Sequence, residues 1–148
     1  MDIYIKNRTI NNETIELKAG DTIVATLHNV VFNNCEVIFN DTYRNIVLGG
    51  VDFNHCKMIF KKKFINAQWK RSKILNCTLS GNLIGNDFGG FPDDFYPTTE
   101  NYHAIFENND LSNCILDGIR FFKVDFNTNI LPQWPNFIIL ILLEIQKG

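Results

Sequence analysis

A five-residue period of large apolar side chains runs through most of this chain and constrains its fold more than any other feature. The period is interrupted once, between Ile84 and Phe106, by a 17-residue insertion, and then resumes in phase. Its members are Leu27, Phe32, Val37, Leu48, Phe53, Met58, Trp69, Ile74, Leu79, Ile84, Phe106, Leu111, Leu116, Phe121, Phe126 and Leu131. A helix would repeat apolar residues at intervals of three and four, so the pattern predicts stacked β structure.

A longer period of 21 residues relates one turn of the repeat to the next. It aligns large apolar side chains into four expected interior columns, each continuous from coil to coil. These columns are Leu27/Leu48/Trp69/Phe106, Phe32/Phe53/Ile74/Leu111, Val37/Met58/Leu79/Leu116 and Tyr43/Phe64/Ile84/Phe121. Because one coil cannot bury its own apolar faces, the pattern predicts a solenoid whose coils stack.

Several segments resemble the consensus of the pentapeptide-repeat family: a small residue, Asp or Asn, Leu or Phe, then two polar positions. The resemblance is clearest at residues 51–55, 109–113 and 124–128, and it extends over residues 25–131. It implies an all-β fold, a right-handed quadrilateral parallel β-helix (a pentapeptide-repeat solenoid) of about four to five coils. The frequent Asn and Gly residues, which suit tight turns, agree with this fold.

The two ends depart from the repeat and are expected to cap it, within a single domain of residues 1–148. Residues 1–24 are predicted to form an N-terminal β cap with a hairpin turn at Asn11 and Asn12. Residues 132–148 are predicted to form an apolar C-terminal cap or a segment through which two copies dimerise. The start lacks a secretion signal, and no apolar run approaches the ~20 residues that span a bilayer. We therefore expect a cytoplasmic protein with no membrane contact.

The cysteines are the most regularly placed polar or reactive residues. Cys35, Cys56 and Cys77 are 21 residues apart, and Cys114 is expected to occupy the same column in the next coil. A metal or redox site would need closely spaced cysteine pairs with further ligands, so we predict reduced, buried core residues. The sequence likewise contains no recognisable catalytic triad or phosphate-binding loop. It predicts no catalytic residue, metal ligand or cofactor.

Charge is unevenly distributed, although the formal net charge is only −2. Residues 57–73 contain seven basic residues and no acid, whereas residues 86–129 have a balance of −6. The candidate basic patch consists of Lys61, Lys62, Lys63, Lys70 and Arg71. A solvated face explains such a patch, and a functional patch would bind an acidic protein or nucleic acid. With a pI near 5.9, direct binding of nucleic acid is not expected.

The insertion, about residues 85–103, departs from the repeat without disturbing its phase. Long loops on regular scaffolds often carry function, and the alternative is an Ω-loop whose aromatic side chains pack on the rod. The candidate partner-binding residues are Phe88, Phe91, Asp93, Asp94, Phe95, Tyr96 and Tyr102. Aromatic anchors beside acidic residues would suit an interface with a basic partner.

These features predict a non-enzymatic scaffold that mediates protein–protein interaction with an unidentified partner, for example in toxin immunity or enzyme regulation. The resemblance implies one alternative, a DNA-mimicking protein that binds and protects DNA gyrase. The short rod, the net charge of −2 and the basic segment disfavour that alternative. An enzyme is a further alternative, although a solenoid filled by side chains offers no internal pocket.

Overall fold

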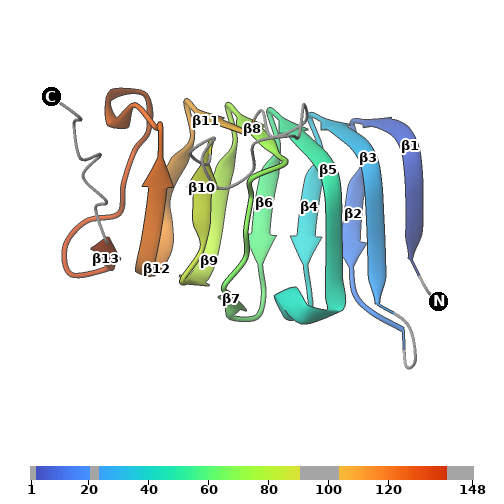
Figure 1. The fold of residues 1–148 in the computed structure, drawn as a ribbon, viewed down its shortest axis with the longest axis horizontal. Coiled ribbons are helices and arrows are strands. Elements are labelled where there is room, and N and C mark those ends of the chain that lie inside the picture. The colour runs from blue at the N-terminus through green and yellow to red at the C-terminus, as the bar shows by residue number, and fades with distance from the viewer. Residues whose placement is uncertain (1–2, 21–23, 91–103, 140–148) are drawn as a thin grey trace, which may run out of the picture.

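The computed structural model describes residues 3–20, 24–90 and 104–139, with side chains as far as residue 136. In these ranges the chain is all-β, and its parallel strands stack into a β-solenoid of about four turns. The strands follow one another along the rod from the N-terminal to the C-terminal end (Figure 1). No helix in the described ranges is long and apolar enough to cross a membrane.

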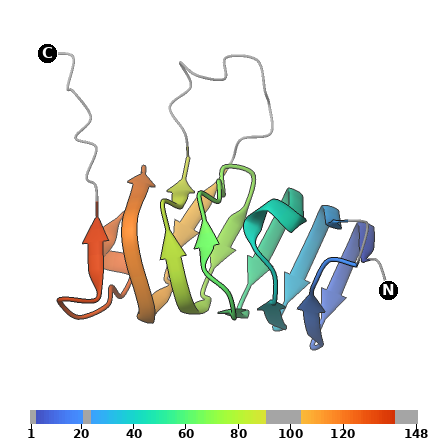
Figure 2. The ribbon, with the colours of Figure 1, turned by 90° about the horizontal axis from the view of Figure 1, so that it is seen from below.

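Two parallel sheets hold the strands, and the chain alternates between them, so that one pass through both makes a coil (Figures 1 and 2). The first sheet contains, in spatial order, β1 (Tyr4–Asn11), β3 (Ala25–Asn33), β5 (Ile46–Asn54), β8 (Lys73–Leu75) and β11 (Ile105–Glu107). The second contains β10 (Asp87–Gly89), β12 (Asp110–Phe122), β9 (Thr78–Ile84), β6 (Lys57–Phe60), β4 (Glu36–Phe39) and β2 (Thr14–Leu17). β7 (Phe64–Ile65) pairs with β9 and β13 (Phe137–Ile139) with β12, while short 3-10 helices, η1 (Tyr43–Asn45) and η3 (Phe126–Thr128), form two turns.

The period that relates successive coils is confirmed in the first part of the rod. The strand registers that confirm it are Leu27↔Leu48, Phe32↔Phe53↔Ile74 and Val37↔Met58↔Leu79. The rings of Phe32 and Phe53 stack with centroids 5.5 Å apart, and both side chains are fully buried. A stacked aromatic pair of this kind stabilises the fold by about 0.5–1.5 kcal/mol more than the burial of its apolar surface alone.

The predicted columns are wrong after the third coil, because the coil that contains the insertion has a different register. Phe106 pairs with Ile74 instead of Trp69, and Ile105 pairs with Lys73. Leu116 likewise pairs with Leu83 instead of Leu79. The fourth predicted column is wrong already at Ile84, because Phe64 pairs with the buried Leu83 and the partly exposed Ile84 pairs with Ile65. Phe88 supplies the first side of this coil before the insertion, so Phe106 takes the second side and not the first.

Residues 86–89, which were assigned to the insertion, belong to the solenoid. They include β10, in which Phe88 pairs with Phe121 of β12. The column at this side therefore runs from Trp69 through Phe88 to Phe121. The stacked structure therefore continues as far as Gly90, whose N–H donates to Phe122 O.

The predicted hairpin at Asn11 and Asn12 is also wrong. β1 and β2 lie in different sheets and pair in parallel with β3 and β4. Asn12 has a φ of 57° and turns the chain through a corner of the coil. The N-terminal residues are β, as expected, but they make the first coil of the solenoid. At the other end, β13 pairs in parallel with β12 and continues the stack.

Among the described residues, asparagine occupies most of the non-glycine positions with a positive φ, where the chain turns between sides. Asn29, Asn34 and Asn76 have φ values of 54°, 51° and 55°, in the left-handed region that asparagine tolerates better than most residues. Side-chain amides at these corners also bridge coils, as where Asn34 Nδ2 donates to Asn12 Oδ1 at 2.7 Å. Such bonds favour in-register stacking.

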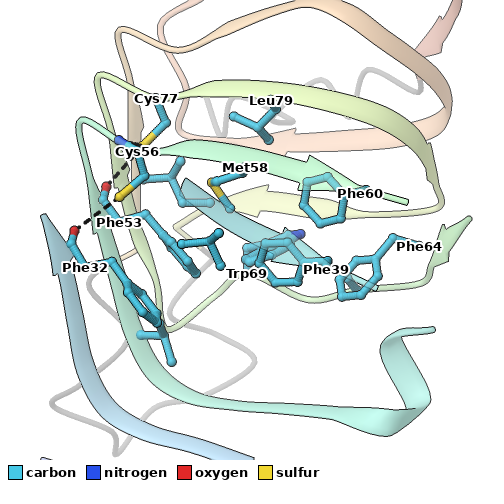
Figure 3. Packing of buried hydrophobic residues seen from close by; sticks show 14 of the residues in the cluster. Phe32, Phe39, Phe53, Cys56, Met58, Phe60, Phe64, Trp69, Cys77 and Leu79 are labelled. Carbon is cyan, nitrogen blue, oxygen red and sulfur yellow. Dashed lines mark hydrogen bonds between the residues drawn. The ribbon is translucent and has the colours of Figure 1, made fainter. Parts of the chain in front are cut away.

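The centre of the rod is aromatic. Phe39 stacks on Phe60 with centroids 4.5 Å apart, and Leu17, Phe39 and Phe60 pair in one column. Figure 3 shows the indole of Trp69 lying among the rings of Phe39, Phe60 and Phe64. The column of Phe39 and Phe60 lies two residues after the Val37 position and was not recognised in the sequence.

Candidate interaction surfaces

The cysteine column is confirmed for three of its four predicted members. Cys35, Cys56 and Cys77 are buried at equivalent positions in successive coils. Each thiol donates to a backbone carbonyl of the preceding coil, at 3.3 Å for Cys35 and at 3.4 Å for Cys56 and Cys77, whose bonds are drawn in Figure 3. Cys114 is buried too but pairs with Gly81, so its predicted place in this column is wrong. The change of register places Cys114 in a different column from the other three cysteines.

In the next coil, Asn109 occupies the position equivalent to Cys77, and its side chain also hydrogen-bonds to the backbone of the preceding coil. Its Oδ1 accepts from Cys77 N at 2.9 Å, and its Nδ2 donates to Ile74 O at 2.9 Å. Asn129 continues the series, because its Oδ1 accepts from Asn109 N at 2.9 Å. Thiols and amides therefore serve one purpose here, which is to bond buried backbone groups between coils. Among the described residues, no group of three or more His, Cys, Asp or Glu is arranged to hold a metal ion.

We expect the thiols of the native protein to be slow toward alkylating reagents. Burial raises the pKa of Cys114 to about 12, and a hydrogen bond with Cys56 together with burial raises the pKa of Cys77. The hydrogen bond with Cys77 lowers the pKa of Cys56 to about 7, so the Cys56 thiol is protected by its burial alone. The thiolate is the reactive form, so labelling at mildly alkaline pH should be about a hundredfold slower in buffer than in denaturant. Rapid labelling of Cys77 in the folded protein would contradict this prediction.

The raised pKa of Cys114 gives a pH dependence of stability. The native state holds this proton more tightly than the unfolded chain, in which a thiol has a pKa of about 8.5. The contribution is fully present below that value and is lost as the pH rises toward the folded pKa. Alkaline conditions should therefore destabilise the fold, which equilibrium unfolding at a series of pH values would measure.

Phe88 is a core residue, which corrects its assignment to the partner-binding surface. Its side chain is fully buried, and its ring stacks on Trp69 at 5.9 Å and on Phe121 at 5.7 Å. The other predicted members of that surface lie outside the described residues, namely Phe91, Asp93, Asp94, Phe95, Tyr96 and Tyr102. That these residues bind a partner stays a prediction.

The chain leaves and re-enters the solenoid at neighbouring points on either side of residues 91–103. Gly90 N donates to Phe122 O at 3.1 Å, and a Cβ on Gly90 would lie 3.5 Å from Ala104 O. Beside this point, Arg120 donates through Nε and Nη2 to the two carboxylate oxygens of Asp87, both at 2.6 Å. This ion pair ties β10 to β12 and holds the base of the insertion.

The basic residues expected to form one patch lie in two places. Lys61, Lys62 and Lys63 are exposed in the turn between β6 and β7, whereas Lys70 and Arg71 shortly precede β8. Figure 1 shows that turn at the lower edge of the rod and β8 at its upper edge. The five residues therefore belong to two different turns of the chain.

Two further basic residues join the lysines at the lower edge and were missed in the sequence. Lys18 follows β2 and Arg44 lies in η1, and both side chains are exposed. In Figure 1 the C-terminal ends of β2, β4 and β6 lie along this edge together with η1 and β7. We call this surface the basic corner, and its residues are Lys18, Arg44, Lys61, Lys62 and Lys63.

The C-terminal segment from residue 140 onward lies outside the described residues, so dimerisation through it stays a prediction. Shortly before it in the sequence, the side chains of Ile130 and Trp134 are 57% and 76% exposed.

Comparison with known proteins adds no relative from which a role for these surfaces could be carried over. No protein-family model, curated protein or solved structure matches this chain.

Proposed function

We propose that this chain is a pentapeptide-repeat protein that acts as a non-enzymatic scaffold, and that it binds a protein partner through residues 91–103. The observation that carries the proposal is the closeness of Gly90 and Ala104. The core columns pass this point without a break, because Phe88 stacks on both Trp69 and Phe121. The solenoid therefore does not need the intervening segment to complete its core.

The family assignment is supported by the spacing of corners and columns. Asn29 and Asn34 turn the chain one pentapeptide apart, and one register relates both β3 to β5 and β4 to β6. Phe32 and Phe53 occupy equivalent positions of two successive pentapeptides of one side. A filled, stacked core of this kind is suited to presenting surface segments at fixed positions.

The composition of the segment indicates the partner's chemistry. Its four aromatic residues would supply anchors, and its acids would favour a basic partner. The DNA-mimic alternative gains no support from Asp87, which was counted in the acidic half but is buried and paired with Arg120. An acid in that position cannot present a phosphate-like charge to a partner.

Deleting residues 91–103 and joining Gly90 to Ala104 should abolish partner binding while changing the free energy of unfolding by less than about 1 kcal/mol. The ends already meet, and the entropy of loop closure depends only weakly on length. Partner binding would be measured by capture from extracts of the source cell, and stability by denaturant unfolding. A matched control replaces the same residues with a Gly/Ser linker of equal length.

Both variants should lose the captured protein, since both lack the aromatic and acidic side chains. If either variant retains it at the wild-type level, the segment is not the binding element. Protection of purified DNA gyrase by the wild-type chain would instead favour the DNA-mimic alternative. If the deletion variant fails to fold but the linker variant folds, the direct connection of Gly90 to Ala104, and not the loss of the side chains, causes the unfolding.

A further inference from the structure

The basic corner is built by stacking, which places residues distant in sequence side by side. Asn40 N donates to Leu17 O, and Lys61 N donates to Phe39 O, both at 2.9 Å. These bonds continue the registers of β2, β4 and β6, so Lys18, Asn40 and Lys61 occupy one exterior column. The rings of Tyr43 and Phe64, 5.4 Å apart, bring η1 and its Arg44 beside β7.

The acids nearest to the basic corner are engaged in other bonds. Asp41 is only 8% exposed, and its carboxylate accepts from Ala19 N, Thr42 N and Asn45 Nδ2. Burial acts to raise the pKa of Asp41, but the hydrogen bonds and the charge of Lys62 outweigh it and hold the pKa below its ordinary value. Asp41 is thus a fixed, buried anion beneath the corner.

No cation of the basic corner forms an ion pair within the described ranges. Glu16, the other nearby acid, accepts from Asn40 Nδ2 at 2.9 Å. The ion pair found in these ranges joins Asp87 to Arg120, which belong to other coils. Among the described residues, five exposed cations therefore lie around two carboxylates, an excess of three positive charges on a chain whose net charge is −2.

An exposed apolar side chain adjoins these cations. Ile65 follows directly on the lysine turn and Phe64, and 46% of its surface is exposed although it belongs to β7. It pairs with Ile84, which is partly exposed on the same side of the rod. Apolar area next to unpaired cations is the arrangement expected of a surface that takes an acidic, partly apolar segment.

We propose that the basic corner binds an acidic segment of a partner protein, with carboxylates on its cations and an apolar side chain on Ile65. The surface spans three coils, about 10 Å at ~4.8 Å per coil, which fits a few residues of an extended chain. Outside the corner's five cations the chain carries −7, since −7 and +5 give −2. A long polyanion such as a nucleic acid would meet that negative charge, whereas a short acidic segment would not. The residues of this surface lie outside residues 91–103 in the sequence, so the inference goes beyond the proposed function.

A labelled peptide of glutamate residues around a central leucine tests the proposal by fluorescence anisotropy with the full chain. The Lys61→Ser/Lys62→Ser/Lys63→Ser variant should bind this peptide about tenfold more weakly, because three exposed charge contacts are lost. Ile65→Ser should weaken binding about threefold, because it removes part of the apolar contact. The matched control, Lys6→Ser/Lys57→Ser/Lys123→Ser, removes three exposed lysines elsewhere and should change affinity less than twofold.

Thermal unfolding of each variant would confirm that all of them fold. Equal weakening by the control triple variant would show a net-charge effect and overturn the assignment to this surface. Absence of peptide binding to the wild type would overturn the proposal as well. Tighter binding of oligothymidylate than of the peptide would overturn the class of partner, and unchanged binding by Ile65→Ser would overturn the apolar contact.

Discussion

Replacing Phe39 with alanine is expected to lower the free energy of unfolding by about 3 to 5 kcal/mol, the range for a large aromatic side chain removed from a packed core. Phe39 is fully buried and contacts four other rings, from the stacked Phe60 at 4.5 Å to the tilted Phe53 at 6.2 Å. Its neighbours belong to different coils, so they cannot close the cavity by moving one strand. Equilibrium unfolding in urea would measure the loss.

Phe126→Ala is the matched control for this change. Phe126 is 43% exposed in η3 and makes an edge contact with Phe121, so its loss should cost less than about 1.5 kcal/mol. A loss of less than about 1 kcal/mol on replacing Phe39 would show that this column is not the packed centre of the rod. Equal losses in the two variants would show that burial does not distinguish the sites.

The columns of the first coils were predictable from the sequence because each depends on a local period. A residue such as Phe53 stands one full coil from each of its neighbours in the stack, and nothing intervenes to alter the count. Phe39 and Phe60 obey the same period but lie outside the five-residue series of large apolar residues. A scan for one large apolar residue in five therefore overlooks them, although a second scan at the length of one coil would find them.

The register of the last coils was not predictable by counting. The five-residue phase was assumed to continue across the insertion, and this assumption placed Phe106 beside Trp69. In the structure, Phe88 supplies the missing side and Phe106 pairs with Ile74. The sequence does contain a signal for this, because Asp87 and Arg120 place opposite charges directly before the two phenylalanines that pair, Phe88 and Phe121.

The surfaces were less predictable than the core because they combine residues from different coils. Lys61, Lys62 and Lys63 were recognised as a run, but Lys18 and Arg44 join them only through stacking. Conversely, Lys70 is near the run in sequence but lies in a different turn, shortly before β8. Exterior columns can be assigned only after the register is known, so an error in register would carry over to every surface assignment.

The buried hydrogen-bond series allows a sharper test of register than any single truncation. Asn109→Ala should lower the free energy of unfolding by about 3 kcal/mol, because it leaves Cys77 N and Ile74 O without their partners in the core. Each buried polar group left unsatisfied costs about 1–3 kcal/mol. Asn109→Cys places at this position the residue found in the three preceding coils, where thiols donate to the equivalent carbonyls.

If thiol and amide are interchangeable here, Asn109→Cys should recover at least half of the stability lost in Asn109→Ala. Its thiol would donate to Ile74 O as Cys77 donates to Phe53 O, and would accept weakly from Cys77 N as Cys77 accepts from Cys56 N at 3.4 Å. Unfolding of the two variants side by side in urea makes the comparison. Equal losses in both would mean that Asn109 does not continue the cysteine column, and the change of register after the third coil would then be wrong.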